Sequence, residues 1–295
     1  MADMKLLDES KIKYVPRNCM LKIRSLYHVL KSAERKALDF LLAYPEKVKQ
    51  LTITEFSDQA GCSEATVVRL ARRLGYEGYT EMKADFAQSM KNNNSIGYED
   101  IKWDDPPFTV FEKVVKSTVA ALHDSLDIMN SEDYKKAVDA IYHANQIMFC
   151  GLGDASFVAL EAQYRFLRAG KNSFAASDPD LQLIYGSKLQ KGDVLIAISY
   201  TGRSRTIIDV VKQAKQSGAT VIAITNFPIS PIAKQADIVL VTAVFTQFLT
   251  VEVMSKRVTE LCILESLSIN YTLRRGEESI NSLVKSLNVV DINKI

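Results

Sequence analysis

Apolar positions in the first third of the chain recur every three or four residues, which is the spacing of amphipathic helices. The pattern predicts a helix near residues 31–44, a helix pair within residues 52–74 and a further helix from about residue 80 to residue 91. In the second helix of the pair one apolar stripe occupies i, i+3, i+4 and i+7: Val67, Leu70, Ala71 and Leu74. We expect this stripe to be buried, which leaves polar and basic side chains on the opposite face.

The residues at the helix boundaries predict where each helix of the pair begins and ends. Thr52, followed three residues later by Glu55, makes a capping box, in which hydroxyl and carboxylate bind N–H groups of the first turn. Gly61 permits the left-handed backbone that ends a helix, and Ser63 can cap the next one. These features predict a helix-turn-helix.

The outer face of the second helix suits the major groove of duplex DNA. Side chains near the start of such a helix reach base edges, and arginine bonds guanine or phosphate. The alternative is a helical hairpin with a solvated basic face. The residues expected to contact DNA are Ser63, Glu64, Thr66, Arg69, Arg72 and Arg73, and all except Arg72 are expected to point outward.

The pattern changes after residue 91. Residues 92–108, NNNSIGYEDIKWDDPPF, are polar and contain paired prolines, so they predict a linker, in which Trp103 can dock on either domain. A helix follows, with a shorter one from about residue 132 to residue 143. The first of these has one apolar face: Phe111, Val114, Val115, Thr118, Val119 and Leu122.

Short apolar runs then alternate with segments long enough for a helix. QIMFC, DVLIAIS, TVIAIT and DIVLVT read as strands buried on both faces, and NSFAA is a weaker candidate between the first two. Such runs are typical of a parallel sheet with helices on either side. The sequence therefore predicts a doubly wound α/β domain that ends in a long helix over about residues 250–274.

Amino-acid composition limits the class of protein but does not identify what the protein binds. The 295 residues are 47% hydrophobic and 24% charged, as in an ordinary globular protein with room for two domains. The net charge is only +2; residues 1–90 carry 15 basic against 12 acidic residues, so basic character is local to the helix pair. The four cysteines and three histidines are too scattered for a metal site, and no segment suits a membrane span or signal peptide. We expect a cytoplasmic protein without a cofactor.

Hydroxyl side chains gather after the third strand expected in this sheet. Ser199, Thr201 and Ser204 surround Gly202 before a helix begins near Arg205. Ligands of open α/β sheets bind beyond the carboxyl ends of strands, where a helix N-terminus presents unpaired N–H groups. The loop therefore predicts a phosphate site, and an ordinary polar turn with a serine N-cap is the alternative.

Two resemblances extend these predictions. The run SEATVVRLARRLGYEGYTEMK resembles the helix-turn-helix signature of the RpiR family of bacterial transcription regulators, over residues 18–90. The run SYTGRS resembles the phosphate loop of the SIS, or sugar isomerase, domain over residues 108–285. The resemblances imply a helical domain over residues 18–91 after an extension at 1–17, a linker at 92–107 and a flavodoxin-like SIS domain at 108–288.

The two resemblances, together with the position of Thr225 and Asn226 at the same edge of the sheet, imply which residues contact a phosphosugar. They are Gly153, Ser156, Ser199, Thr201, Gly202, Ser204, Thr225 and Glu252, with Asn226 and Arg257 as weaker candidates. One departure is that Ala155 occupies the usual place of a serine, so Ser156 lies one position late. Asp154 beside an anion is unfavourable unless it binds sugar hydroxyls.

The tract Gly151-Leu152-Gly153 also permits a dinucleotide-binding interpretation, because it follows a strand and precedes a helix. Ser156 stands where that motif has its third glycine, and no acidic residue lies at about 20 residues' distance after a second strand. We therefore favour the phosphosugar interpretation.

Three functions follow as hypotheses. The first is a transcription regulator in which a phosphorylated sugar changes affinity for double-stranded operator DNA, acting as a homodimer or homotetramer on palindromic sites. The second is an aldose–ketose phosphosugar isomerase, which needs an acid and a base at the pocket; Glu161, Glu252, His123 and His143 are weak candidates, and we assign no catalytic residue. The third is a DNA-binding protein whose α/β domain only dimerises.

Overall fold

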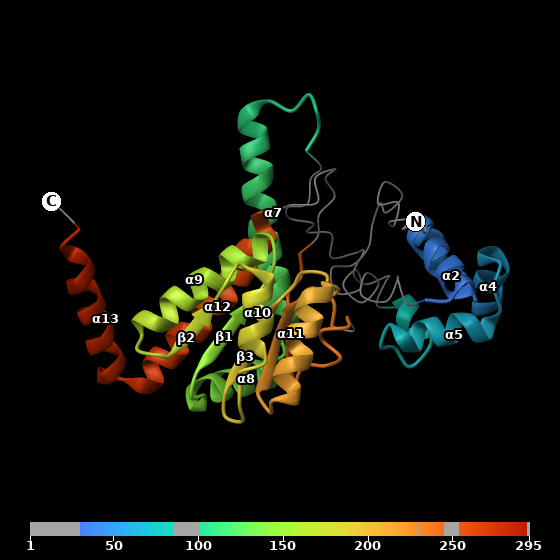
Figure 1. Cartoon of the computed structure of the whole chain (residues 1–295). Coiled ribbons are helices and arrows are strands. Elements are labelled where there is room, and N and C mark those ends of the chain that lie inside the picture. Colours follow the sequence, from blue (N-terminus) through green and yellow to red (C-terminus); the bar gives the residue numbers. More distant parts are fainter. Residues whose placement is uncertain (1–29, 85–100, 229, 245–253, 294–295) are drawn as a thin grey trace. The chain divides into compact units, whose positions relative to one another are not determined.

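The computed structural model describes residues 30–84, 101–228, 230–244 and 254–293 (Figure 1). The chain forms two compact units, Met1–Ile96 and Gly97–Ile295. Glu252 and the second half of the helix expected at residues 80–91 lie outside the described residues.

The first unit is helical, as the spacing of apolar residues predicts. Its helices are α2 (Ser32–Ala43), α3 (Pro45–Val48), α4 (Ile53–Ala60) and α5 (Glu64–Arg73), and residues 79–84 are also helical. The stripe of Val67, Leu70, Ala71 and Leu74 is buried, so that prediction is confirmed. It packs with α2 and α4 around Phe56, whose ring lies edge-on to Phe40 at a centroid distance of 5.3 Å.

The caps of α4 and α5 form where the sequence places them. The hydroxyl of Thr52 accepts the N–H of Glu55, and the carboxylate of Glu55 accepts the N–H of Thr52 at 2.7 Å. Gly61 ends α4 with a φ of 64°, and Ser63 caps α5. Because each signal acts within one turn, the α4–turn–α5 geometry follows from local chemistry.

The second unit contains a parallel sheet in the order β2-β1-β3-β4-β5. All of its strands coincide with the apolar runs of the sequence: β1 (Ile147–Cys150), β2 (Ser173–Ala175), β3 (Val194–Ile198), β4 (Thr220–Thr225) and β5 (Ile238–Val241). From β1 the chain adds β2 on one side, and from β3 onward it adds strands on the other side, so the strand order reverses between β1 and β3. In such sheets ligands bind beyond the carboxyl ends of the strands at this point.

Helices cover both faces of the sheet (Figure 1). Alternate strand residues pack on one side against α8 (Ser131–His143), α9 (Asp154–Arg168) and α12 (Met254–Arg275). The others pack against α10 (Pro179–Gly186) and α11 (Arg205–Gln216). This two-sided burial explains the continuously apolar strands and confirms the doubly wound α/β fold.

One helix of this unit is unexpected, and another forms as expected but leaves part of its apolar face exposed. Helix α13 (Glu277–Asp291) follows α12 after Gly276, where the sequence analysis placed no further helix. Helix α7 (Pro107–Ile128) forms, but residues of its apolar face remain exposed, including Phe111, Val115 and Val119, while Lys113 and Asp124 are buried. Trp103 is 90% exposed.

Candidate functional site

The outer face of α5 is less uniformly exposed than the sequence predicts. Ser63 and Glu64 are exposed at its start, but Thr66 is buried, and the expectation that it points outward is wrong. Its hydroxyl lies 2.9 Å from that of Ser63, whose Oγ also accepts the Thr66 N–H. Thr66 therefore belongs to the cap of α5.

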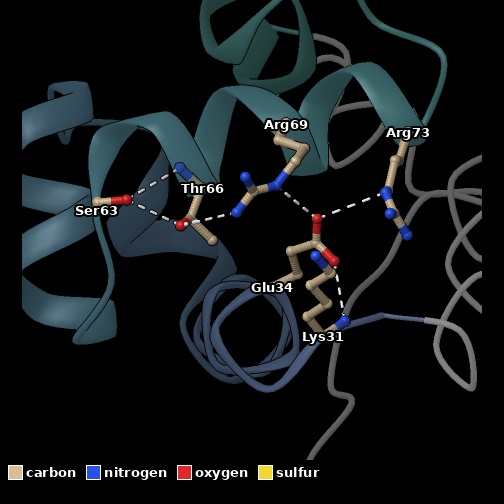
Figure 2. Close-up of polar contacts among 6 residues, drawn as sticks. All are labelled: Lys31, Glu34, Ser63, Thr66, Arg69 and Arg73. Carbon is tan, nitrogen blue, oxygen red and sulfur yellow. Dashed lines mark hydrogen bonds and ion pairs between the residues drawn. The ribbon is translucent and has the colours of Figure 1, made fainter.

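Arg69 and Arg73 both contact a buried carboxylate on another helix. Glu34, in the first turn of α2, accepts the Nε–H of Arg69 at 2.9 Å, and the same oxygen lies 3.5 Å from Nε of Arg73 (Figure 2). Burial alone would raise the pKa of Glu34, but the Lys31 N–H and the two guanidinium groups outweigh it and hold this pKa below its ordinary value. Arg69 and Arg73 on the outer face of α5 are therefore both held by a buried side chain of α2.

Arg72 and Glu64 complete this surface. Arg72 is exposed and donates from Nε to the backbone carbonyl of Glu77 at 3.4 Å, while Glu64 accepts the hydroxyl of Thr54 on α4. One open depression runs along the helix and is lined by Ala65, Val68, Arg69, Arg72 and Arg73. A hollow edged by three arginines can accept an anionic backbone.

In the second unit, the loop after β3 is held at the carboxyl edge of the sheet. Ser199 is buried, its N–H donates to the carbonyl of Ile224, and its own carbonyl accepts the N–H of Gly202. Gly202 has a φ of 60°, and a Cβ there would lie 2.1 Å from Oγ of Ser230. Only glycine fits this position without displacing a neighbour.

The loop leads into the start of α11. Ser204 is the N-cap of α11 and makes no side-chain capping bond, and Thr201 is exposed with its hydroxyl accepting the Arg203 N–H at 3.4 Å. The hydroxyls expected at the phosphate site therefore lie on one loop beside the unpaired N–H groups of a helix start.

Thr225 and Asn226 hold the loops in place. The Thr225 hydroxyl donates to the carbonyl of Tyr200 at 3.1 Å and accepts the N–H of Phe227. Asn226 is fully buried, and its Oδ1 accepts the N–H of Val244 at 2.7 Å. Since these polar atoms are already bonded to the protein, the contacts favour a structural role for both residues.

The glycine loop after β1 is equally constrained. Gly153 has a φ of 61° and caps α9, and the Ser156 hydroxyl donates to its carbonyl at 2.6 Å. Gly151 lies so close to the first turn that a Cβ there would meet the Ala155 carbonyl oxygen at 2.7 Å. The amide of buried Gln182 donates to the Gly151 carbonyl at 2.9 Å, which fixes the loop from the α10 side. Ser156 thus serves the helix start.

A buried lysine joins the two loops, and sequence reasoning missed it. Lys256, in the first turn of α12, has its Nζ 2.5 Å from Oδ2 of Asp154 and 5.4 Å from the ring centroid of Tyr200. Its side chain is only 10% exposed. Lys256 therefore neutralises Asp154, whose charge is unfavourable beside an anion, and it brings a cation to the carboxyl edge of the sheet.

Two further ionisable groups of α12 lie near this pair. Arg257 is half-buried, and its Nε has no hydrogen-bond partner within the described residues. Glu260 is buried; desolvation and the negative charge of Asp154 raise its pKa to about 8, against the opposing effect of Lys256 and Arg257. At neutral pH the Glu260 carboxyl therefore holds its proton.

The raised pKa of Glu260 predicts a pH-dependent stability. Between pH 4.5, the ordinary pKa of a glutamate, and about pH 8, the Glu260 carboxyl is protonated in the folded chain and ionised in the unfolded chain. The free energy of unfolding should fall as pH rises through this range, by up to about 1.4 kcal/mol per pH unit. We expect Glu260→Gln to flatten this dependence in melting curves recorded from about pH 5 to about pH 8.

The control for this experiment is Glu265→Gln on the same helix. Glu265 is 41% exposed and pairs with Arg165, so its replacement should leave the slope close to that of the wild type. A Glu260→Gln variant with the full wild-type slope would contradict the assignment.

The part of the chain that the structure describes contains no candidate metal cluster and no candidate membrane helix. No cluster of three or more His, Cys, Asp or Glu side chains that could hold a metal ion occurs within the described ranges. His143 lies at the C-terminal end of α8, where its Nδ1 is 2.9 Å from the Asp139 carbonyl oxygen. Among the helices that the structure describes, none has the length and apolar character to cross a bilayer.

Comparison with known proteins agrees with both units. Residues 17–93 match the helix-turn-helix domain of the rpiR family, and residues 140–269 match the SIS domain. The HTH-type transcriptional regulator HexR of Pseudomonas aeruginosa is 32% identical over 260 residues, which are 88% of this chain and 91% of that protein. The chain belongs to the RpiR family of transcriptional regulators.

Other relatives of this RpiR-family chain extend the match. The HTH-type transcriptional regulator YbbH of Bacillus subtilis is 31% identical over 265 residues, covering 90% of this chain and 94% of that protein. The structure of Vibrio vulnificus NanR in complex with ManNAc-6P superposes with a TM-score of 0.61 at 24% identity, over 93% of this chain and 100% of that one. The superposition supports the fold of both units.

Proposed function

We propose that this RpiR-family chain is a DNA-binding transcription regulator of carbohydrate metabolism genes, controlled by a phosphorylated sugar in the SIS domain. The observation that carries the effector class is the loop from Ser199 to Ser204, which places hydroxyls at the start of α11. The buried cation of Lys256 lies 5.4 Å from the ring centroid of Tyr200 on the same loop. A phosphate group matches hydroxyl donors, helix N–H groups and a cation together.

The DNA contacts belong to the exposed part of α5. Ser63, Glu64, Arg69, Arg72 and Arg73 remain proposed contacts, whereas buried Thr66 acts through the cap. The arginines can bind phosphates or guanine, and the start of the helix can approach base edges. This surface supports the proposal that the chain recognises a specific operator.

The effector contacts belong to the carboxyl edge of the sheet. Ser199, Thr201, Gly202 and Ser204 are proposed to hold the phosphate, and Lys256 to balance its charge. Gly153 and Ser156 shape the neighbouring loop, Thr225 supports Tyr200, and Glu252 stays a proposed contact from the sequence resemblance alone. The sugar ring then faces the residues of α12.

A second copy of the chain is the proposed partner for the exposed apolar faces. On α7, Phe108, Phe111, Val115 and Val119 are at least 42% exposed and follow helical spacing. Helix α9 has a similar stripe: Phe157, Leu160, Tyr164 and Leu167. Burial of these stripes would give a homodimer, or a homotetramer if both are used, with recognition helices on half-sites about 34 Å apart.

Effector control requires that the sugar bind one arrangement of this assembly more tightly than another. A dimer can have two such arrangements that differ in the separation of the recognition helices. In one of them both helices fit the two half-sites, and in the other they do not. The proposal therefore predicts coupling between operator and effector affinity.

Isomerase activity is the competing hypothesis, and protonated Glu260 is the group that favours it, since aldose–ketose isomerisation needs acid–base groups at the pocket. We propose that the chain is not an enzyme. NMR of phosphosugars incubated with the purified chain tests this: turnover well above background would overturn the sensor-only assignment.

Two single substitutions should separate DNA binding from effector binding. Arg72→Ala should weaken operator binding about tenfold, because it removes an exposed cation from the proposed DNA-binding face. Effector affinity should stay unchanged, because the proposed effector site lies in the other unit, and folding should be spared, because Arg72 bonds to the Glu77 carbonyl and not to buried Glu34. Ser199→Ala should weaken effector binding about tenfold and spare operator affinity. Fluorescence anisotropy with operator DNA and calorimetry with the effector measure the two affinities. Loss of both affinities in either folded variant would contradict this division.

A further inference from the structure

Glu34 is a buried carboxylate at the start of α2 that lies 35 residues before the arginine to which it bonds. Its side chain has no exposed surface, and Figure 2 shows it between Lys31 on one side and the arginines of α5 on the other. A charge in this position is costly unless it is fully bonded.

The two oxygens of Glu34 have different tasks. Oε2 accepts the N–H of Lys31 at 2.9 Å, which satisfies a backbone donor at the start of α2. Oε1 accepts Nε of Arg69 at 2.9 Å and lies 3.5 Å from Nε of Arg73. Capping the helix needs only the first oxygen. The second oxygen therefore serves α5.

The Nε hydrogen bond orients the Arg69 guanidinium group, and the ion pair places the Arg73 Nε beside the same Glu34 oxygen. Because Glu34 holds the inner nitrogen, the Nη groups lie further from the buried carboxylate; Nη2 of Arg69 lies 3.4 Å from the Thr66 hydroxyl (Figure 2). The two side chains remain 51% and 37% exposed. Like charges four residues apart on a helix repel, and the shared carboxylate offsets this repulsion.

The geometry points to Glu34 as a positioning residue for sequence-specific DNA recognition, an inference that rests on the proposed function. Glu34 does not reach the nucleic acid. It orders the guanidinium groups of Arg69 and Arg73, which lowers the entropy lost when they bind. Contacts to base edges require a fixed direction, whereas attraction to phosphates tolerates a mobile cation. Glu34 therefore acts on specificity rather than on general DNA affinity.

The test compares specific and non-specific binding by the full chain. Duplexes selected from a random pool by the wild type serve as the specific probe, and a scrambled duplex of equal composition is the non-specific probe. Glu34→Gln keeps the size of the side chain but removes its charge and places an amide N–H₂ against a donor. We expect about tenfold weaker binding to the selected duplex, with unchanged or stronger binding to the scrambled one.

The matched control is Glu55→Gln. Glu55 has the same capping position at the start of α4, where it accepts the Thr52 N–H at 2.7 Å, and it contacts neither arginine. Glu55→Gln should leave the ratio of the affinities for the selected and the scrambled duplex unchanged. If Glu34→Gln does not fold, Glu34→Asp keeps the charge but is too short to reach both arginines, and it should lower the ratio similarly.

The outcomes separate this inference from the proposed function. A wild-type ratio in a folded Glu34 variant, or an equal loss of both affinities, would overturn the positioning role and leave the proposed function standing. Failure of the wild type to select any sequence would overturn both.

Discussion

Gly202→Ala should abolish detectable phosphosugar binding while the first unit stays folded and binds DNA. The new Cβ would lie 2.1 Å from Oγ and 2.4 Å from Cβ of Ser230, and 3.1 Å from the hydroxyl of Thr225. The φ of 60° adds backbone strain of about 1 kcal/mol, and overpacking costs about 1–3 kcal/mol more. Relief of this clash moves the loop that carries the hydroxyls. Isothermal titration calorimetry with a panel of sugar phosphates measures the loss.

The chain offers a matched control for strain alone. Gly218, after α11, has a φ of 83°, but a Cβ there would find its nearest neighbour at 3.6 Å. Gly218→Ala should therefore cost stability and spare effector affinity. Adding Ser230→Gly to Gly202→Ala should restore part of the binding, because it removes the nearest side-chain atoms. Wild-type affinity in Gly202→Ala would refute the assignment of the loop as the phosphate site.

Lys256→Met should have the second largest effect. The substitution keeps much of the side-chain volume but leaves Asp154 without the cation that lies 2.5 Å from it. Loss of one partner from a buried pair costs about 3–5 kcal/mol, reduced here because Asp154 is 22% exposed. An anionic effector beside an unbalanced carboxylate should bind at least tenfold more weakly.

A double variant separates the two roles of Lys256. Asp154→Asn combined with Lys256→Met removes both charges and should recover most of the thermal stability. If Lys256 also attracts the effector, the double variant should still bind sugar phosphates about tenfold more weakly than the wild type. Full recovery of affinity in calorimetry would show that Lys256 only neutralises Asp154.

The parts of the fold that depend on local chemistry could be predicted from the sequence. The caps at Thr52 and Ser63, the left-handed Gly61 and the buried stripe of α5 depend on residues a few positions apart. The strands were equally readable, because burial on both faces leaves them continuously apolar. The helix-turn-helix and the parallel sheet follow from such short-range patterns.

The contacts between distant residues could not be predicted in this way. Nothing in the spacing of Glu34 and Arg69 reveals that they meet, and the same holds for Asp154 and Lys256. The outward position predicted for Thr66 is wrong because its hydroxyl bonds to Ser63 in the cap of α5, which turns this polar residue inward. Helix periodicity identifies a face, and tertiary packing decides whether that face is buried, as the exposed side chains of α7 show.

The most direct test of the account is the coupling between effector and operator in the full chain. Fluorescence anisotropy with a labelled operator duplex, titrated at several concentrations of each sugar phosphate, gives the factor by which the effector changes operator affinity. We expect at least one sugar phosphate to change operator affinity about fivefold or more, and the operator to change the affinity for that sugar phosphate by the same factor. Independent binding of operator and sugar phosphate, each with unchanged affinity in the presence of the other, would contradict it.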